Sequence, residues 1–250
     1  MQPFTLLCLL TAVVEFGAGL AVFPKSDRTV KSKHGSRDWS LKGVQKMNDA
    51  LDFILIFGSL KGADIIDDVL DNFTPTCYIA PYYETKTVKY GNTIKPGKTE
   101  EAPSVHIFCP GKTEVSGLTI ALTDPDAPSR DDDSMSEMCH WIAKVPSVVI
   151  GRDLVADFNA TDLFSAIDYK APAPPEGTDK HRYVFVLLEG PNVNLTVPEE
   201  RKHWGFEKPG SGVRDWAIQE NLTVIGANFH YEKHQEKKSD SLRFKIQPWY

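Results

Sequence analysis

The spacing of apolar residues changes along the chain from a helical to a strand-like pattern. From Leu41 to Leu55 apolar residues recur at intervals of three and four, which predicts an amphipathic helix. Its end is expected at Gly58 or Gly62, because glycine commonly follows the last turn of a helix. A second, shorter helical piece is predicted over residues 63–70.

Beyond residue 75 the chain has the pattern of short β-strands. Six runs are rich in β-branched and aromatic residues and are bounded by Gly, Pro and Asn turn residues. These runs cover residues 77–83, 85–90, 104–108, 118–122, 141–145 and 183–188. A helix over residues 213–220 and a last strand over 223–231 are also predicted. Strands at this spacing predict a mostly β fold, an antiparallel sheet or sandwich with a few helices.

The first residues resemble a secretory signal peptide. Phe4 to Val14 is mostly apolar and small residues follow, so cleavage is expected after Ala21. An uncleaved anchor is the alternative, but the apolar run is too short to span a bilayer comfortably. The predicted organisation is a signal peptide (1–21), a polar leader with the helical extension (22–62), a folded domain (63–232) and a charged tail (233–250). The predicted location is the secretory pathway or the extracellular space.

Composition narrows the possible functions. The chain has 250 residues, 41% of them hydrophobic, which is enough for one sizeable core. A net charge of −6 argues against a nucleic-acid partner. No other apolar stretch is as long as the signal, so no transmembrane segment is expected after its removal. No zinc-type spacing, phosphate-binding glycine loop or nucleophile elbow occurs in the sequence, so neither a metal nor another cofactor is expected.

Cysteines and sequons agree with secretion. Of four cysteines, Cys8 lies in the signal, so Cys77, Cys109 and Cys139 allow at most one internal disulfide. Cys77–Cys109 is the first pairing to test because both look like strand residues, whereas Cys139 is interpreted as a small core residue. Four N-x-[ST] sequons are candidate glycosylation sites, at Asn72, Asn159, Asn194 and Asn221.

The segment LTDPDAPSR places two carboxylates, Asp124 and Asp126, on either side of Pro125 after an apolar run. In one interpretation both acids accept backbone hydrogen bonds and shape the turn. In the other they form a wall of a pocket and orient histidines. A cis bond in such a tight turn is possible at Ala127–Pro128.

Two histidines favour the second interpretation. His140 and His181 each lie at a transition from polar to apolar sequence, where a side chain reaches the rim of a sheet. A carboxylate beside an imidazole raises its pKa and selects its tautomer, and two such histidines make an anion site. The hydroxyl of Tyr183 is placed to contribute, while alternation along a strand sends Arg182 to the opposite face. Two satisfied structural histidines are the alternative.

Together these segments resemble the phosphatidylethanolamine-binding protein family. The resemblance covers about 65–232 and is carried by four segments: Asp124-Pro-Asp-Ala-Pro-Ser-Arg130, Cys139-His-Trp141, Pro174-Pro-Glu-Gly-Thr178 and His181-Arg-Tyr-Val-Phe185. The Cys-His-Trp variant and the signal are most similar to secreted fungal members. Where the family usually has Gly-x-His, this chain has Asp179 and Lys180, which put charge at the rim.

The resemblance implies a fold of two antiparallel sheets with a few peripheral helices, to which this chain adds an N-terminal helical extension. It also implies a small pre-formed pocket for anions. The pocket residues would be Asp124, Asp126, His140, His181 and Tyr183, shaped by Pro125, Pro128 and Pro174.

Three functions are compatible with such a protein. The first is binding of a small anion, either a phospholipid headgroup, a phosphate or a dicarboxylate. The second is an accessory role beside a pathway enzyme in fungal maleic-anhydride polyketide dimerisation, with His140 or His181 as a base. The third is inhibition of a serine carboxypeptidase. No catalytic residue is otherwise assigned, because the sequence shows no activated nucleophile, and a binding or accessory protein is favoured over a stand-alone enzyme.

Overall fold

The computed structural model describes residues 50–150 and 155–235, which lie within one compact unit. The predicted signal peptide, the polar leader up to residue 49 and the tail from residue 236 lie outside the described residues. No helix of the described part is long and apolar enough to cross a membrane.

A six-stranded sheet forms the centre of the described domain, and its order is β10-β7-β6-β11-β12-β3. The strands are β3 (Asn92–Thr93), β6 (Leu118–Asp124), β7 (Met138–Lys144), β10 (Phe164–Ile167), β11 (His181–Glu189) and β12 (Thr223–Glu232). All pairs are antiparallel except β12 with β3. Every residue of β6 is buried, as expected for a strand covered on both faces.

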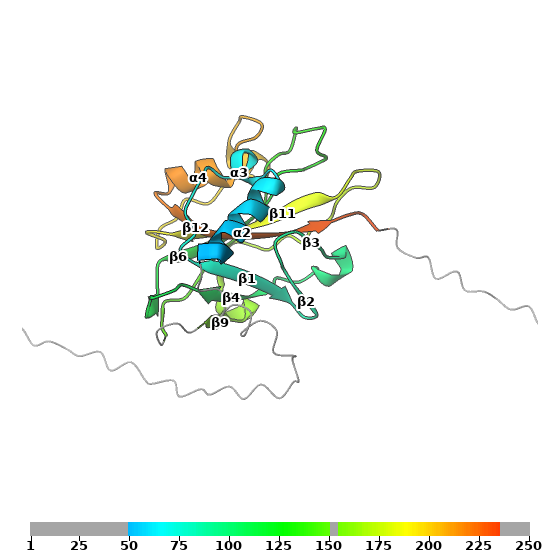
Figure 1. The fold of residues 1–250 in the computed structure, drawn as a ribbon. Coiled ribbons are helices and arrows are strands. Elements are labelled where there is room, and N and C mark those ends of the chain that lie inside the picture. Colours follow the sequence, from blue (N-terminus) through cyan, green and yellow to red (C-terminus); the bar gives the residue numbers. More distant parts are fainter. Residues whose placement is uncertain (1–49, 151–154, 236–250) are drawn as a thin grey trace, which may run out of the picture. The chain divides into compact units, whose positions relative to one another are not determined.

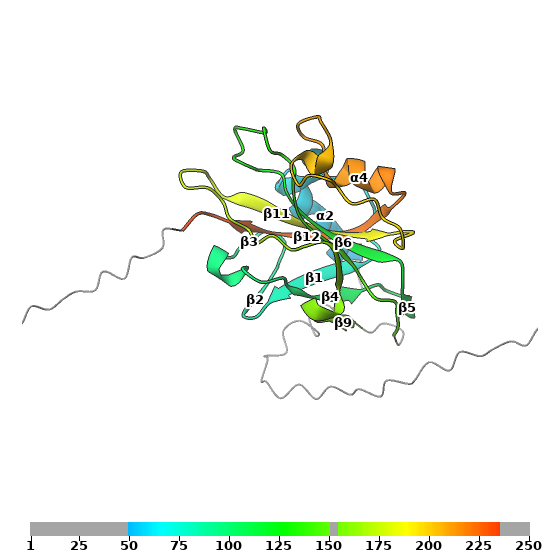
Figure 2. The same ribbon diagram turned by 180° about the vertical axis from the view of Figure 1, so that it is seen from behind.

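A second sheet has four strands in the order β2-β1-β4-β9 (Figure 2). They are β1 (Tyr78–Tyr83), β2 (Lys86–Thr87), β4 (Ser104–Phe108) and β9 (Ala156–Phe158), while β5 (Glu114–Val115) and β8 (Val148–Val149) form a separate small pair. Single 3-10 turns occur at Pro96–Lys98, Ala160–Asp162 and His203–Gly205. The mostly β fold with two main sheets is therefore confirmed.

Alternation along the central strands gives the domain two cores. On β11, Phe185 and Leu187 pack between the two sheets with Ile79 and Ile107 of the four-stranded sheet. Val184 and Val186 point the other way, into a core shared with the helices. The helices therefore cover one face of the central sheet and the four-stranded sheet covers the other (Figure 1).

The helices follow the predictions in part. α2 (Ala50–Gly62) ends at the predicted Gly62 and buries Ile56 and Leu60, and α4 (Val213–Gln219) lies where a late helix was expected. The helix predicted over 63–70 is wrong. Only α3 (Ile65–Asp68) is assigned there, and its interior is not helical: Asp67 has φ 90°. Buried Arg182 binds both the carbonyl of Ala63 and the carboxylate of Asp68, which holds this segment as an irregular turn.

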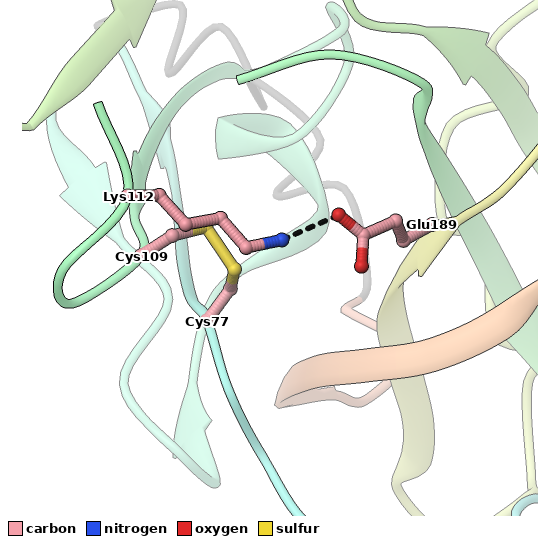
Figure 3. Close-up of a disulfide and its surroundings, with 4 residues drawn as sticks. All are labelled: Cys77, Cys109, Lys112 and Glu189. Atoms are coloured by element: carbon pink, nitrogen blue, oxygen red, sulfur yellow. Dashed lines mark hydrogen bonds and ion pairs between the residues drawn. A yellow bond between two sulfur atoms is a disulfide. The ribbon is translucent and has the colours of Figure 1, made fainter. Parts of the chain in front are cut away.

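One disulfide joins the two central strands of the four-stranded sheet. Tyr78 pairs with Phe108 at the end of the β1–β4 ladder, and the next two residues along, Cys77 and Cys109, are bonded. The ion pair of Lys112 with Glu189 lies nearby (Figure 3). The predicted pairing is confirmed, and Cys139 is a free, buried cysteine. Burial raises the pKa of its thiol to about 12, so it has little thiolate at neutral pH.

Candidate functional site

Sheet topology brings the predicted acids and histidines to one end of the central sheet. β6 ends at Asp124, and its antiparallel neighbour β11 begins at His181, so the two residues lie at the same edge. His140 lies on β7, the other neighbour of β6. Tyr183 follows two residues after His181 and faces the same side. Asp124, His140, His181 and Tyr183 are called the histidine cluster below.

Asp124 fixes the turn and one histidine at the same time. Its Oδ1 accepts the backbone N–H of Asp126 at 2.9 Å, and its Oδ2 lies 2.9 Å from His181 Nδ1. A carboxylate only accepts, so Nδ1 carries a hydrogen. At the other ring nitrogen, Thr178 Oγ1 lies 3.3 Å from Nε2 while donating its single hydrogen to the Pro175 carbonyl. Asp124 and Thr178 therefore hold the His181 ring at both of its nitrogens.

The other histidine of the cluster is neutral. His140 Nδ1 lies 2.7 Å from the Lys170 carbonyl oxygen, so Nδ1 donates and Nε2 is left as an acceptor. Burial lowers the pKa of His140 to about 4, although the charge of Asp124 acts to raise it. The carboxylate acts in the expected direction, but the loss of hydration outweighs its attraction, so the net pKa of His140 is lowered.

Tyr183 contributes a permanent donor. Its ring meets His140 edge-on at 5.2 Å between centroids and lies nearly parallel to His181 at 6.4 Å. Burial raises the pKa of the Tyr183 hydroxyl far above its usual range, and the charges of Asp124 and Glu232 raise it further. The phenol therefore keeps its proton, which a hydrogen bond to the Asp124 carboxylate also favours.

The proline-rich segment 170–178 closes the histidine cluster. Three of its residues contact the three aromatic rings of the cluster: Lys170, Ala173 and Thr178. The rings are at most 3% exposed as a result. Pro174, expected near the mouth, is buried, and its carbonyl lies 3.2 Å from His234 Nδ1 just beyond β12.

Asp126 serves a different partner. Its Oδ1 lies 2.7 Å from Arg182 Nη2, and its Oδ2 accepts the Arg182 backbone N–H at 2.7 Å. Arg182 also donates to Asp68 and to the Ala63 carbonyl, both at 2.9 Å. The expectation that both acids orient histidines is therefore corrected: Asp126 faces the helix side, where alternation also sends Arg182. Asp68, Asp126 and Arg182 are called the arginine cluster.

A cleft of about 370 Å³ borders the arginine cluster. It is lined mainly by charged residues, including Asp64, Arg130 and Glu137, and by Pro125. Burial raises the pKa of Glu137 to about 8, although hydrogen bonds from Thr123 and the Val213 backbone act to lower it. Ala127–Pro128 is cis, as predicted. No group of three or more His, Cys, Asp or Glu side chains among the described residues is placed to hold a metal ion.

Sequence reasoning missed two polar residues beside the histidine cluster. His230 and Glu232 lie on β12 directly opposite Tyr183 and His181 of β11. His230 stacks on Tyr183 with 5.5 Å between ring centroids. The signal available was a histidine and a glutamate two residues apart in an apolar strand, which places both on one face. Only the register shows which face that is.

The fold and the histidine cluster define a class of β-protein with a closed polar site between the ends of its central strands. The sequence model described as phosphatidylethanolamine-binding protein matches residues 84–230, more than half of the chain. The chain therefore belongs to the phosphatidylethanolamine-binding protein family.

Two relatives give the membership more detail. The carboxypeptidase Y inhibitor of Saccharomyces cerevisiae is 30% identical over 217 residues, which is 74% of this chain and 98% of the relative. A crystal structure of a carboxypeptidase Y inhibitor complexed with its cognate proteinase superposes with a TM-score of 0.64 over 76% of this chain and 100% of the inhibitor, at 30% identity.

A phosphatidylethanolamine-binding protein from Plasmodium vivax has a TM-score of 0.56 at 20% identity, covering 71% of this chain and 97% of that one, which shows the fold alone.

Proposed function

We propose that this protein binds a small oxyanion, a phosphate or a carboxylate, at the histidine cluster. The observation that carries the proposal is the convergence of three polar side chains at one end of the central sheet: His181 held by Asp124, the hydroxyl of Tyr183, and His140 with Nε2 as an acceptor. Charge-assisted hydrogen bonds to oxyanions are stronger than neutral ones. The acceptor Nε2 of His140 favours an anion that still carries one proton, such as hydrogen phosphate.

Calorimetric titration with inorganic phosphate tests this proposal. His140→Ala and His181→Ala are each expected to weaken binding about tenfold or more, because one hydrogen bond involving a charged group contributes ~1.5–3 kcal/mol. His106→Ala is the matched control: His106 is also buried, but it lies on β4 and stacks on Tyr82. Affinity unchanged in both cluster variants would overturn the proposal.

A second candidate function, inhibition of a serine carboxypeptidase, is favoured by the similarity to the carboxypeptidase Y inhibitor. That relative is matched over nearly its whole length. The test is the residual activity of a serine carboxypeptidase after incubation with the full chain, and dose-dependent loss of activity is expected. The double variant His140→Ala/His181→Ala in the same assay separates inhibition from anion binding. Full protease activity at saturating protein would contradict this function.

The proposed compartment is the secretory pathway. A disulfide is typical of oxidising compartments, and the four sequon asparagines are all exposed. A smaller apparent mass after treatment with an endoglycosidase is the expected result for protein secreted by a eukaryotic host. N-terminal sequencing of the same sample tests cleavage after Ala21. The accessory role in polyketide dimerisation stays a prediction.

A further inference from the structure

The cleft beside the arginine cluster holds a buried carboxyl group without a cationic partner. Glu137, the residue before β7, lines this cleft and is only 2% exposed. Its carboxyl group accepts hydrogen bonds from Thr123 and from the backbone N–H of Val213, and both go to Oε2. Among the described residues, Oε1 has no hydrogen-bond partner. Buried carboxylates are nearly always paired with a cation, so this group requires an explanation.

The charged residues of the cleft are matched to one another, except for two acids. Arg130 and Arg182 both bind Asp126, and Arg182 also binds Asp68 at 2.9 Å. Two acids that line the cleft form no ion pair with any described residue: Asp64 and Glu137. The acids of the cleft therefore outnumber the cations that the described part of the chain supplies.

The carboxyl group of Glu137 is protonated at neutral pH. The charge of Arg214, on α4, acts to lower the pKa of Glu137, but the Arg214 side chain donates to Asp71 at 3.0 Å and to the Asp67 carbonyl at 3.2 Å. Burial outweighs this charge and raises the pKa of Glu137 to about 8. A cation placed beside the carboxyl group would favour the ionised form.

The backbone around Glu137 holds the carboxyl group in one position. The N–H of Glu137 donates to the Ser211 carbonyl at 3.1 Å, and the N–H of Gly210 donates to the Ser136 carbonyl at 2.9 Å. Gly212 packs directly against the carboxyl group, where a Cβ atom would collide with it. A group that is fixed before a ligand arrives loses little conformational entropy on binding, which favours affinity.

We propose that this cleft binds a guanidinium group, such as that of an arginine side chain, with Glu137 as the buried counter-ion and Asp64 as a second carboxylate. A guanidinium group is more weakly hydrated than an ammonium group and its planar donors match carboxylates, so it is the cation favoured for buried ion pairs. The cleft volume of about 370 Å³ falls within the range of ~300–1,000 Å³ that is typical of ligand sites. On binding, the carboxylic acid of Glu137 becomes a carboxylate and its proton passes to the solvent.

Three peptides test the proposal on the unaltered full chain by calorimetry. Each is an acetylated and amidated tripeptide with glycine at both ends, and the middle residue is arginine, citrulline or lysine. Citrulline has the shape of arginine without its charge, so the arginine peptide is expected to bind about tenfold more tightly, as one charge-assisted hydrogen bond implies. The lysine peptide is expected to bind more weakly than the arginine peptide. Equal affinity for arginine and citrulline, or tighter binding of lysine, would overturn the proposal.

Proton release identifies Glu137 as the group that meets the guanidinium. At pH 7 a group with a pKa of about 8 is mostly protonated, so binding of the arginine peptide is expected to release about one proton. Titrations in two buffers of different ionisation enthalpy measure this number. Glu137→Gln resembles the protonated side chain and should fold normally, but the release should disappear and the ratio of arginine to citrulline affinity should fall toward one. Glu207→Gln is the matched control, because Glu207 is exposed and does not line the cleft.

Other titratable or charged groups that face Glu137 could exchange a proton with the solvent instead. They are Arg214 and Asp215 of α4, His203 at the neighbouring 3-10 turn, Cys139 of β7, and the aspartates and arginines of the cleft. All of them are retained in Glu137→Gln. Proton release that persists in this variant would therefore come from one of them and would overturn the assignment to Glu137.

Agmatine, which carries a guanidinium group without a peptide backbone, distinguishes the two sources of this group. Affinity equal to that of the arginine peptide indicates a small free ligand, and weaker binding indicates an arginine side chain of a polypeptide. Either source supports the proposal, provided that arginine is preferred over citrulline.

The inference goes beyond anion binding and does not depend on it. The cleft borders Asp126 on the helix side of the central sheet, whereas the histidine cluster lies on the other side. The double variant His140→Ala/His181→Ala should therefore bind the arginine peptide as the unaltered chain does, even where it has lost phosphate binding. Loss of peptide binding in this folded double variant would overturn the placement of the site in the cleft.

Discussion

His181 and Arg182, the first two residues of β11, point to opposite faces of the central sheet. The two clusters to which they belong differ in how many of their hydrogen-bonding groups already have a partner. On the helix side, Arg182 is surrounded by acceptors: both oxygens of Asp126, the carboxylate of Asp68 and the Ala63 carbonyl. On the side between the sheets, His181 is held by Asp124 and a long contact of 3.3 Å to Thr178. The first network uses four of the five N–H donors of the guanidinium, and in the second Nε2 of His140 is left as an acceptor.

The arginine cluster therefore stabilises the fold, whereas the histidine cluster is the candidate binding site. The arginine cluster fixes the irregular segment at Ala63–Asp68 to the sheet, because Arg182 donates to the Ala63 carbonyl and to Asp68 as well as to Asp126. The histidine cluster holds a neutral ring with a free acceptor and lies beside two unpaired atoms of His230 and Glu232. Two aspartates two residues apart therefore have different functions because their partners differ.

The largest expected effect comes from removing Asp126, the main partner of Arg182 in the arginine cluster. Asp126→Ala leaves Arg182 buried without its main partner, which should lower the free energy of unfolding by about 3–5 kcal/mol. Urea denaturation measures this change. Asp126→Asn, which keeps an acceptor for the Arg182 backbone N–H, should cost less. Exposed ion pairs contribute less than about 1 kcal/mol. A decrease in the free energy of unfolding of that size for Asp126→Ala would contradict a stabilising role of the arginine cluster.

The next effect is a pH dependence on the histidine side. The pKa of His140 is about 4 in the folded protein against an ordinary 6.5, so the unfolded chain takes up the proton first as the pH falls. The free energy of unfolding should therefore decrease between pH 6.5 and 4, by up to about 3 kcal/mol at ~1.4 kcal/mol per pH unit. His140→Gln should flatten this slope in urea denaturation series. The same pH dependence of the free energy of unfolding in the unaltered protein and in His140→Gln would show that burial of His140 does not cause it.

A smaller effect is expected from Asp124→Asn. The asparagine keeps an acceptor for the backbone N–H of Asp126 but removes the negative charge that lies 2.9 Å from His181 Nδ1. Phosphate affinity should fall about tenfold, or ~1.4 kcal/mol, while stability falls less than in Asp126→Ala. Calorimetry and urea denaturation of the same two variants give the comparison directly. Reversed effects, with Asp126 controlling affinity and Asp124 controlling stability, would contradict the division between the two clusters.

The smallest effect is expected from Arg130→Ala. Arg130 Nε lies 3.3 Å from Asp126 Oδ1, but its side chain is 40% exposed. Exposed pairs contribute less than about 1 kcal/mol, so thermal unfolding should shift only slightly. A loss as large as that of Asp126→Ala would show that Arg130, rather than Arg182, is the main partner of Asp126.

Most strands and the alternation on β11 could be predicted from the sequence, because apolar periodicity is a local property. β4 matches its prediction, and His181 and Arg182 do point to opposite faces. Five strands of two to four residues were not predicted, because so short a run carries little periodicity: β3, β5, β8, β9 and β10. The position of Glu232 beside the histidine cluster was also missed, since it comes from the register that places Glu232 opposite His181.

The sequence by itself determined the family and the mostly β fold, because these follow from local patterns and motifs, and it gave Cys77–Cys109 as the first disulfide pairing to test. The tertiary structure decided which carboxylate meets which cation: Asp124 meets His181 and Asp126 meets Arg182. It also decided that His140 is neutral. Partners and pKa values depend on burial and on contacts between strands distant in sequence, and neither is encoded in a run of neighbouring residues.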